Sequence, residues 1–296
     1  MPETLTKSAF ASAARAGETV WVAGCHDALS AKLAEEAGFP AVMTSGFGVS
    51  ASFLGMPDVE LYTMSENLAV IRNVANCIDA PLIADGDTGY GNAVNVMRTV
   101  REFEQAGVAG IIFEDQVAPK RCPAVATSID ILPIDENTAK IEAAVEARRD
   151  ADTLIIARTD AMNEDEAIRR AKAYASAGAD LIQPISKCFS SADGLKRLRE
   201  ACGKPLSLQI LGWLETDLSR DDIQAVAGVA VYPLVSLMSA AEAMRQNFAR
   251  LMADKSTRDL PQPVMSMTEF KNFIGFQEIE DLQAKFLMQR VDSGYD

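Results

Sequence analysis

The stretch of sequence that indicates the fold most directly is Leu82-Ile83-Ala84-Asp85-Gly86-Asp87-Thr88-Gly89-Tyr90-Gly91-Asn92. Here an apolar run ends in two carboxylates and a glycine-rich turn. Side chains two residues apart on a strand share a face, so Asp85 and Asp87 project to the same side. Such carboxylates raise each other's pKa unless a cation lies between them, and Mg²⁺ suits that position. The alternative interpretation is an acidic turn that caps a helix beginning near Asn92.

Three more apolar runs end at ionisable or glycine residues. They are Gly110-Ile111-Ile112-Phe113-Glu114-Asp115, Leu154-Ile155-Ile156-Ala157-Arg158-Thr159-Asp160 and Val42-Met43-Thr44-Ser45-Gly46-Phe47-Gly48. In each run the polar part follows the apolar part along the chain. A β/α barrel gathers its active site at the carboxyl ends of its strands, so this asymmetry favours that fold.

Strand-like and helix-like segments alternate along most of the chain. The predicted strands are 19–23, 41–45, 82–85, 110–114, 154–158, 180–184, 205–210 and 228–234. The predicted helices include 28–37, 92–106, 137–147, 164–177 and 192–201, several of which end at glycine. Eight strands predict an α/β fold, a (β/α)8 barrel of the TIM type. A doubly wound open sheet is the alternative.

The C-terminal part departs from this alternation. Pro261-Gln262-Pro263 predicts a boundary between a barrel domain, 1–260, and a helical extension, 261–296. Within the extension, 267–290 has helical periodicity, and its apolar residues are Phe270, Phe273, Ile274, Leu282, Phe286 and Leu287. A finished barrel has no place for this surface, so we expect it to pack on the barrel exterior or on a partner subunit.

Composition restricts the function classes. The formal charge of −14 argues against nucleic-acid binding and requires local cations to hold an anionic substrate. No apolar run is long enough to span a bilayer, and the N-terminus lacks a signal-peptide pattern. Five cysteines without paired spacing favour free thiols in a reducing cytoplasm. We therefore expect a cytoplasmic enzyme with no membrane or nucleic-acid partner.

In combination and order, several phrases resemble the isocitrate lyase/phosphoenolpyruvate mutase superfamily over nearly the whole chain, nearest its 2-methylisocitrate lyase and 2,3-dimethylmalate lyase branch. These phrases are 28–33, Ser45-Gly46, Leu54-Gly55-Met56-Pro57-Asp58, 85–92, Glu114-Asp115-Gln116, Pro119-Lys120-Arg121-Cys122 and 157–160. The resemblance implies a barrel with an exchanged C-terminal helix in a homo-oligomer, usually a dimer of dimers. It also implies Mg²⁺, with Mn²⁺ as the alternative ion, near Asp85, Asp87 and Glu114, partly through water.

The chemistry implied by the resemblance makes or breaks a bond to C3 of a pyruvate-like unit through an enolate. Arg158 and the metal would hold the 2-oxo and carboxylate oxygens, and preorganised charges of this kind are usually the largest catalytic term. The Ser45 hydroxyl with the Gly46 and Phe47 backbone N–H groups would anchor the carboxylate. The resemblance also implies catalytic roles for Asp58 and Lys120. The alternative for Arg158 is a buried ion pair with Asp160 or Glu114.

Cys122 separates the branches of the family. In its carbon–carbon lyases, a cysteine after Lys-Arg or Lys-Lys lies on a mobile loop and gives a proton to the leaving enolate. Lys120 and Arg121 would lower the pKa of this thiol and help it to transfer a proton near neutral pH. The alternative is an ordinary loop thiol. Its place in Glu-Asp-Gln-Val-Ala-Pro-Lys-Arg-Cys favours the lyase interpretation.

Other positions depart from the lyase pattern. Pro123-Ala124 replaces Gly-His, Met43 replaces a tyrosine, and Ile185 replaces a glutamate. The Asn-Xaa-Thr group of the seventh strand is absent around Gln209. The groups that would handle the 2-hydroxyl and the further carboxylates of isocitrate-like substrates are thus rewritten, whereas the pyruvate half of the site is intact.

Three enzymatic readings and one non-enzymatic reading follow. The first is a Mg²⁺-dependent carbon–carbon lyase acting on a substituted malate or a related small 2-hydroxy or 2-oxo dicarboxylic acid. The second is an oxaloacetate decarboxylase or hydrolase, and the third a phosphonopyruvate hydrolase or mutase. A metal-free binding scaffold is disfavoured because Asp58, Asp85, Asp87, Glu114, Lys120 and Arg158 are all present.

Overall fold

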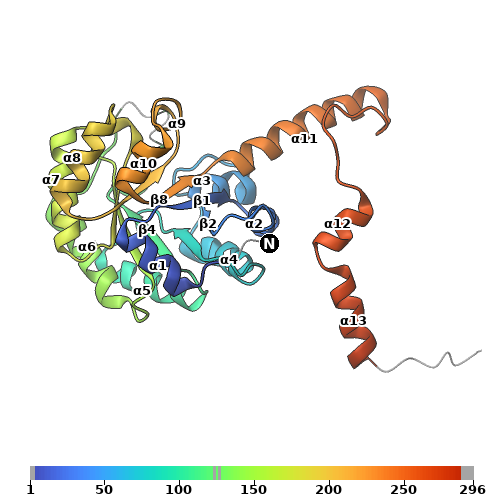
Figure 1. Ribbon diagram of the computed structural model, residues 1–296, viewed down its shortest axis with the longest axis horizontal. Helices are drawn as coiled ribbons and strands as arrows, with labels where there is room; N and C mark the ends of the chain where they lie inside the picture. Colours follow the sequence, from blue (N-terminus) through green and yellow to red (C-terminus); the bar gives the residue numbers. More distant parts are fainter. Residues whose placement is uncertain (1–3, 123–124, 126–127, 288–296) are drawn as a thin grey trace, which may run out of the picture. The chain divides into compact units, whose positions relative to one another are not determined.

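The computed structural model describes residues 4–122, 125 and 128–287. The chain divides into two compact units, Met1–Met238 and Ser239–Asp296. The first unit contains a closed barrel of parallel strands in the order β1 to β8, as predicted (Figure 1). The strands are β1 (Val20–Cys25), β2 (Ala41–Thr44), β3 (Leu82–Asp85), β4 (Gly110–Glu114), β5 (Leu154–Thr159), β6 (Leu181–Pro184), β7 (Leu206–Gln209) and β8 (Ala227–Tyr232).

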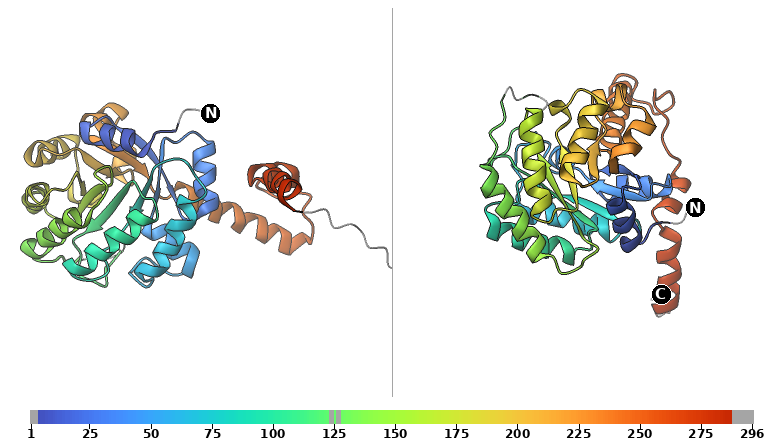
Figure 2. Two further views of the ribbon diagram at one scale, coloured as in Figure 1. Left: turned by 90° about the horizontal axis from the view of Figure 1, so that it is seen from below. Right: turned by 60° about the vertical axis from the view of Figure 1, so that its left-hand side comes forward.

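Helices surround this barrel (Figure 2). Those following strands β1 to β7 are α2 (Ala28–Glu36), α4 (Met64–Ala75), α5 (Ala93–Gln105), α6 (Ile134–Ala147), α7 (Glu164–Ser176), α8 (Ala192–Cys202) and α10 (Arg220–Val226). Short turns add α3 (Gly46–Val49), the π-helix η1 (Ser50–Leu54), the 3-10 turn η2 (Ser186–Cys188) and α9 (Trp213–Thr216). The doubly wound alternative is therefore excluded.

The strands read as continuous apolar runs because both of their faces are buried. Side chains such as Ile83, Ile112 and Ile156 form an inner cluster within the barrel. The N-terminal helix α1 (Lys7–Ala16) contributes Phe10 to this cluster. Alternate residues such as Ile111 belong to an outer cluster that packs under the helices. The two clusters make the strands a rigid support for the polar residues at their carboxyl ends.

The sequence around Asn92 explains where helix α5 begins. The Asn92 side chain accepts hydrogen bonds from the backbone N–H groups of Val94 and Asn95 and so caps α5. The cap is thus Asn92, and the aspartates before it are available for other contacts. Strand register then places two candidate site residues side by side, because Glu114 of β4 is the register partner of Arg158 of β5.

The second unit consists of helical segments. Helix α11 (Val235–Asp254) begins in the first unit and continues into this one, and α12 (Met267–Phe273) and α13 (Phe276–Phe286) follow. The predicted helix over 267–290 is wrong in its continuity, because Gly275 takes a left-handed backbone (φ 86°) between α12 and α13. Its last residues, 288–290, lie outside the described residues. The structural division falls after Met238, whereas the sequence places the domain boundary at 260/261.

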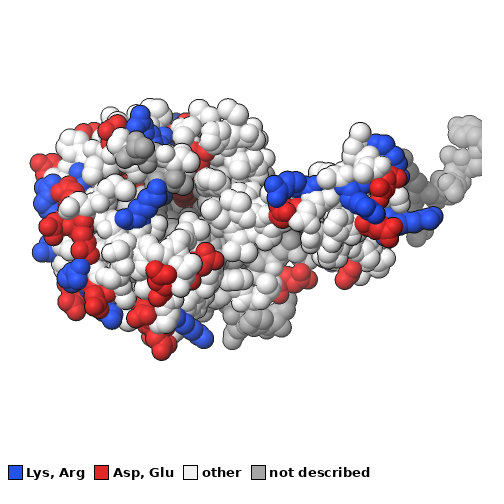
Figure 3. Space-filling view, turned by 90° about the horizontal axis from the view of Figure 1, so that it is seen from above, with Lys and Arg blue, Asp and Glu red and all other residues white. Residues whose placement is uncertain are grey.

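Acidic and basic side chains are interspersed on the face drawn in Figure 3, where no broad basic patch appears. None of the described helices combines the length and the apolar character needed to cross a bilayer.

Candidate active site

A cavity of about 460 Å³ opens in the first unit and is lined by residues that follow the barrel strands. Its polar lining includes Ser45, Asp58, Asp85, Cys122 and Arg158. These are predicted site residues from five separate parts of the sequence. The fold thus brings the predicted residues into one cavity, as the barrel geometry requires.

Asp85 is the carboxylate at the end of β3, and its side chain is 7% exposed. Its Oδ2 accepts from the Gly46 backbone N–H at 3.0 Å, and its Oδ1 accepts from the Asp87 backbone N–H at 3.1 Å. Burial, followed by the charge of Asp87, raises the pKa of Asp85 to about 6. The cations near Asp85 therefore do not offset the cost of burying its charged carboxylate.

Asp87 is completely buried, and three neighbouring side chains contact its carboxylate. Its Oδ2 accepts from the Tyr62 hydroxyl at 2.6 Å and from the Tyr90 hydroxyl at 2.8 Å. Its Oδ1 lies 2.5 Å from Lys120 Nζ. Asn67 supports the arrangement by donating to the Tyr90 hydroxyl at 2.8 Å. Three donors therefore fix Asp87 in place.

Lys120 joins two carboxylates. Its Nζ lies 3.0 Å from Asp58 Oδ1 as well as 2.5 Å from Asp87. Burial by itself lowers the pKa of Lys120, but Asp87, Glu114 and Asp58 raise it well above its usual range. Burial raises the pKa of Asp58, although Lys120 opposes the rise. The three carboxylates thus favour the protonated form of Lys120.

Arg158 forms the ion pairs that were the alternative interpretation of this residue. Its guanidinium contacts Glu114 Oε2 at 3.0 Å and Asp160 Oδ1 at 2.8 Å. The same side chain lines the cavity, so Arg158 can pair with these two carboxylates and also contact a bound ligand. Burial raises the pKa of Glu114 well above its usual range, although Arg158 opposes the rise. Glu114 Oε1 is buried and accepts no hydrogen bond from any described residue.

The carboxylates of the site fit the implied metal in their chemistry more than in their present arrangement. Among the described residues, no three His, Cys, Asp or Glu side chains converge to hold one metal ion. The reason is visible in the ion pairs, because Lys120 engages Asp87 and Arg158 engages Glu114. Even so, Asp85, Asp87 and Glu114 supply only hard oxygens, and Glu114 Oε1 lacks a partner. The donor set therefore fits a hard cation such as Mg²⁺, which Asp85, Asp87 and Glu114 would hold.

Some of the groups predicted to bind a substrate carboxylate already have partners within the protein. Ser45 and Phe47 line the cavity, and the Ser45 hydroxyl is the N-cap of α3, with Gly48 N at 3.5 Å. The Gly46 N–H is instead occupied by Asp85 Oδ2. A Cβ on Gly46 would lie 2.8 Å from the Tyr62 hydroxyl oxygen and 2.9 Å from Asp85 Oδ2. This glycine therefore permits close packing beside the carboxylates.

Cys122 lies on the cavity wall and is half-buried. The two cations expected to act on its thiol are engaged elsewhere. Lys120 contacts Asp58 and Asp87, and the Arg121 guanidinium contacts Ser128. The following departures from the lyase pattern, Pro123 and Ala124, lie outside the described residues.

The far part of the cavity is mainly apolar, and its polar residues are Gln183, Ser186, Lys187 and Gln209. Gln209 Nε2 donates to Gln183 Oε1 at 3.2 Å, and its distance to Met43 Sδ is 3.5 Å. Ser207 also donates to Gln183 Oε1, at 2.9 Å. The apolar lining residues are Met43, Phe47, Pro184, Ile185, Leu211, Trp213, Pro233 and Leu234. The departures at Met43, Ile185 and Gln209 thus lie in one region.

Sequence reasoning missed several groups that support the site. Tyr62 and Asn67 lie outside the quoted motifs, and only their contacts identify them. Glu60 is a further example, since it accepts from the Lys120 backbone N–H at 3.0 Å and from the Thr88 hydroxyl. Its left-handed backbone (φ 59°) is the kind of local feature that no propensity predicts for glutamate.

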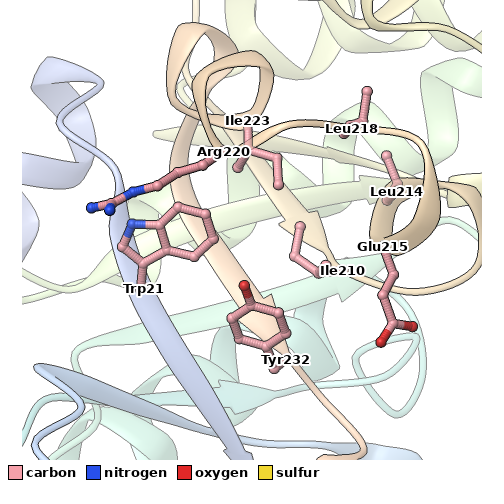
Figure 4. Close-up of a pocket in the computed structure, with 8 residues that line it drawn as sticks. All are labelled: Trp21, Ile210, Leu214, Glu215, Leu218, Arg220, Ile223 and Tyr232. Carbon is pink, nitrogen blue, oxygen red and sulfur yellow. The ribbon is translucent and has the colours of Figure 1, made fainter.

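A second cavity, of about 500 Å³, opens on the outside of the barrel (Figure 4). Trp21 of β1 and Tyr232 of β8 stack with ring centroids 6.0 Å apart, and Arg220 lies over the Trp21 ring. The other lining residues are Ile210, Leu214, Glu215, Leu218 and Ile223. The adjoining β1 residues Val20 and Val22 belong to the inner cluster, so Trp21 faces outward from the barrel.

Comparison with known proteins gives a consistent result. Residues 10–252 match the family described as phosphoenolpyruvate phosphomutase. A 2,3-dimethylmalate lyase from Eubacterium barkeri is 39% identical over 272 residues, which cover 90% of this chain and 93% of that enzyme. A 2-methylisocitrate lyase from Shewanella oneidensis is 32% identical over 285 residues, covering 94% and 97% of the two chains. A solved structure of phosphonopyruvate hydrolase with oxalate and Mg²⁺ has a TM-score of 0.85 at 34% identity, covering 96% and 100%.

Proposed function

Because the chain belongs to the phosphoenolpyruvate mutase/isocitrate lyase superfamily, we propose that it is a Mg²⁺-dependent carbon–carbon lyase. Members of this superfamily are lyases and mutases that act on small acids. The proposed substrate is a small 2-hydroxy dicarboxylic acid, and the products are pyruvate or another 2-oxo acid and a shorter carboxylate. The single observation that carries the lyase assignment is a thiol, Cys122, on the wall of the cavity that Asp85 and Arg158 line.

Asp85, Asp87 and Glu114 would hold the metal. When bound, Mg²⁺ supplies a Lewis acid that polarises the substrate oxygens. The chain's own residues account for binding. Arg158 pairs with the substrate carboxylate beside the reacting carbon, and the Ser45 hydroxyl donates to the same group. Both are at the carboxyl ends of strands, so little reorganisation is required when charge develops.

The proton steps are assigned to two further cavity residues. Asp58 accepts the proton of the 2-hydroxyl, since burial raises its pKa and makes it a better base than an exposed carboxylate. The C2–C3 bond then breaks, C2 becomes a carbonyl carbon, and the electron pair remains on the departing carboxylate fragment. The Cys122 thiol gives its proton to that fragment. Lys120 positions Asp58 through their 3.0 Å contact.

The other two enzymatic hypotheses use the same residues to bind the pyruvate-like part of the substrate. An oxaloacetate decarboxylase or hydrolase would not need the thiol as a proton donor to the departing fragment, and a phosphonopyruvate hydrolase or mutase would act on a carbon–phosphorus bond. Sequence similarity to a 2,3-dimethylmalate lyase at 39% identity, together with Cys122, favours the carbon–carbon lyase.

A substrate panel tests the proposal. Initial rates are measured with Mg²⁺ on 2,3-dimethylmalate, 2-methylisocitrate, oxaloacetate and phosphonopyruvate, with pyruvate and oxalate as the detected products. We expect turnover of a 2-hydroxy diacid, and loss of that turnover in Asp85→Ala with the fold retained. Turnover of oxaloacetate or phosphonopyruvate alone would replace the lyase assignment. Failure to bind Mg²⁺ and oxalate would favour the metal-free scaffold.

We also propose that the protein is a homo-oligomer in which the Ser239–Asp296 unit of one copy covers the barrel of another. Apolar side chains support this. The outer cavity presents Trp21 and Tyr232, and helices α11, α12 and α13 have no buried residue. The large exposed apolar residues of that unit include Met244, Phe248, Met252, Phe270, Phe276, Ile279, Leu282 and Phe286.

Two variants test the assembly. Deletion of 267–296 removes part of the apolar surface, and Leu282→Glu places a charge within it. We expect both to lower the subunit count measured by light scattering, because a charge at a packed interface is costly. If both variants keep the parent's subunit count and solubility, this assembly is wrong.

A further inference from the structure

We propose that Glu60 is a positioning residue that holds the Cys122 thiol in place for its proton transfer, an inference that rests on the proposed function. Glu60 lies in the connection between η1 and α4 and is not among the described residues that line the cavity. Its carboxylate bridges two other loops. Oε2 accepts from the Lys120 backbone N–H at 3.0 Å, and Oε1 accepts from the Thr88 hydroxyl. Glu60 therefore ties the loop of Cys122 to the loop that follows Asp85.

The Thr88 end of this bridge is anchored to the barrel. Thr88 is completely buried, and its backbone carbonyl accepts from Lys140 Nζ of helix α6. Lys140 is itself 3% exposed. Burial lowers the pKa of Lys140, and the charge of Glu60 opposes that change. Glu60 thus faces a buried cation as well as a buried hydroxyl, and both of these groups belong to elements packed on the barrel core.

The Lys120 end of the bridge leads directly to the thiol. Cys122 is two residues further along the chain and lines the cavity. The Arg121 backbone N–H between them donates to Gln116 Oε1 at 2.9 Å. Gln116 belongs to the same loop, whereas Glu60 comes from a different one. The ion pairs of the Lys120 ammonium group do not involve Glu60, so loss of the Glu60 carboxylate releases the backbone before Cys122 and leaves those pairs in place.

The backbone of Glu60 supports a specific role for its side chain. Its left-handed conformation (φ 59°) is unfavourable for a glutamate, and residues held in this way concentrate at functional sites. The residues two positions away on either side also reach the site. Asp58 contacts Lys120 Nζ at 3.0 Å, and the Tyr62 hydroxyl donates to Asp87 at 2.6 Å. The segment 58–62 therefore directs three of its side chains to the loops after β3 and β4.

Proton transfer depends on where the donor lies. A general acid must come within hydrogen-bond reach of the atom that it protonates, and a displacement of about 1 Å can lower a rate by about 10²-fold. A backbone N–H bound to a carboxylate makes a charge-assisted hydrogen bond, which is stronger than a neutral one. Loss of the Glu60 bond should lower the fraction of molecules in which Cys122 is in place. Asp85 and Arg158 should still bind metal and ligand.

The experiment compares Glu60→Met with Glu60→Gln in the full-length protein, with Mg²⁺ and the diacid that the panel identifies. Methionine keeps the side-chain length without the acceptor, whereas a glutamine amide can accept from the Lys120 N–H and donate to the Thr88 hydroxyl oxygen. Glu60→Met should lower kcat about 10- to 100-fold, the effect of losing a hydrogen bond to a charged group, with KM and oxalate affinity unchanged. Glu60→Gln should recover most of the rate.

Alkylation of Cys122 by iodoacetamide, followed by mass spectrometry, reports on the thiol without turnover. With Mg²⁺ and oxalate bound, Glu60→Met should be alkylated at Cys122 several-fold faster than the parent, because the loop opens more often. Glu60→Gln should resemble the parent. Thr88→Val removes the other end of the bridge and should change kcat and alkylation in the same direction by a smaller factor, so it tests the bridge even where Glu60→Met does not fold.

The matched control is Glu66→Met. Glu66 Oε2 also accepts from a backbone N–H and a threonine hydroxyl, at 2.7 and 2.8 Å, but both belong to Thr63 at the start of the same helix. This variant loses the same kinds of bond without touching the Cys122 loop. It should match the parent in kcat and in the alkylation rate of Cys122.

A double variant separates this inference from the proposed function. In the Cys122→Ser background, Glu60→Met should lower kcat little further, because the group that Glu60 positions is gone. Losses from Glu60→Met and Cys122→Ser that multiply would overturn the positioning role, as would parent-like kcat and alkylation in both Glu60→Met and Thr88→Val. If Cys122→Ser keeps most of the parent's rate, the lyase assignment itself is wrong, and the alkylation rates still decide whether Glu60 holds the loop.

Discussion

Replacing Asp85 with asparagine is predicted to stabilise the metal-free protein at alkaline pH. In the folded state the pKa of Asp85 rises from 3.8 to about 6. Keeping the group ionised at pH 8 therefore costs the folded protein about 3 kcal/mol, because each tenfold change in proton affinity corresponds to about 1.4 kcal/mol. Asparagine loses the bond from the Asp87 N–H, at about 1–2 kcal/mol. The net gain in the free energy of unfolding is about 1–2 kcal/mol.

The pH dependence follows from the direction of the shift. A carboxyl group whose pKa is raised by folding is destabilising above that pKa and becomes less so as the pH falls. The advantage of Asp85→Asn should shrink as the pH falls through 6 and disappear by about pH 5. Added Mg²⁺ should reverse the order, because a ligand at about 100 times its Kd adds about 2.7 kcal/mol to the protein that binds it.

Urea denaturation measures these changes, with EDTA or Mg²⁺ at pH 5 and pH 8 and at one fixed protomer concentration. Asp79→Asn, at an exposed carboxylate, is the control and should be neutral throughout. The reasoning is refuted if Asp85→Asn is no more stable than the parent at pH 8 in EDTA. It is also refuted if Mg²⁺ raises both midpoints equally.

Three other predictions concern single positions. Cys122→Ser should lower turnover of the diacid about 10²–10⁴-fold with oxalate affinity unchanged, since a hydroxyl is a poorer proton donor; a small loss in initial rate would favour the decarboxylase. Tyr62→Phe removes the 2.6 Å bond to Asp87 and should cost about 1–3 kcal/mol in urea denaturation, whereas an unchanged midpoint would show that this bond is dispensable. Gly89→Ala should destabilise the protein by at least about 1 kcal/mol, because φ is 86° and its Cβ would lie 2.5 Å from Val96 Cγ2; equal thermal midpoints would contradict that conformation.

The main features of the fold could be predicted from local pattern. Strands buried on both faces appear as continuous apolar runs, and their polar ends mark the active-site side of a barrel, so the eight strands are close to their predicted positions. The start of the helix after Asn92 could also be predicted from the sequence, because an N-cap acts within a few residues of the chain. The break at Gly275 was harder, since amphipathic periodicity continues across a residue whose backbone angle departs from the helix.

The sequence by itself predicted residues that the structure brings to one cavity, because they are polar residues placed at the ends of apolar strands. It did not determine their pairing. Lys120 contacts Asp87 and Arg158 contacts Glu114 only because the barrel closes and its register brings separate strands to one level. Tyr62 is a partner of Asp87 for the same reason. Contacts across a barrel depend on strand register and loop conformation, which are set by the packing of the whole chain.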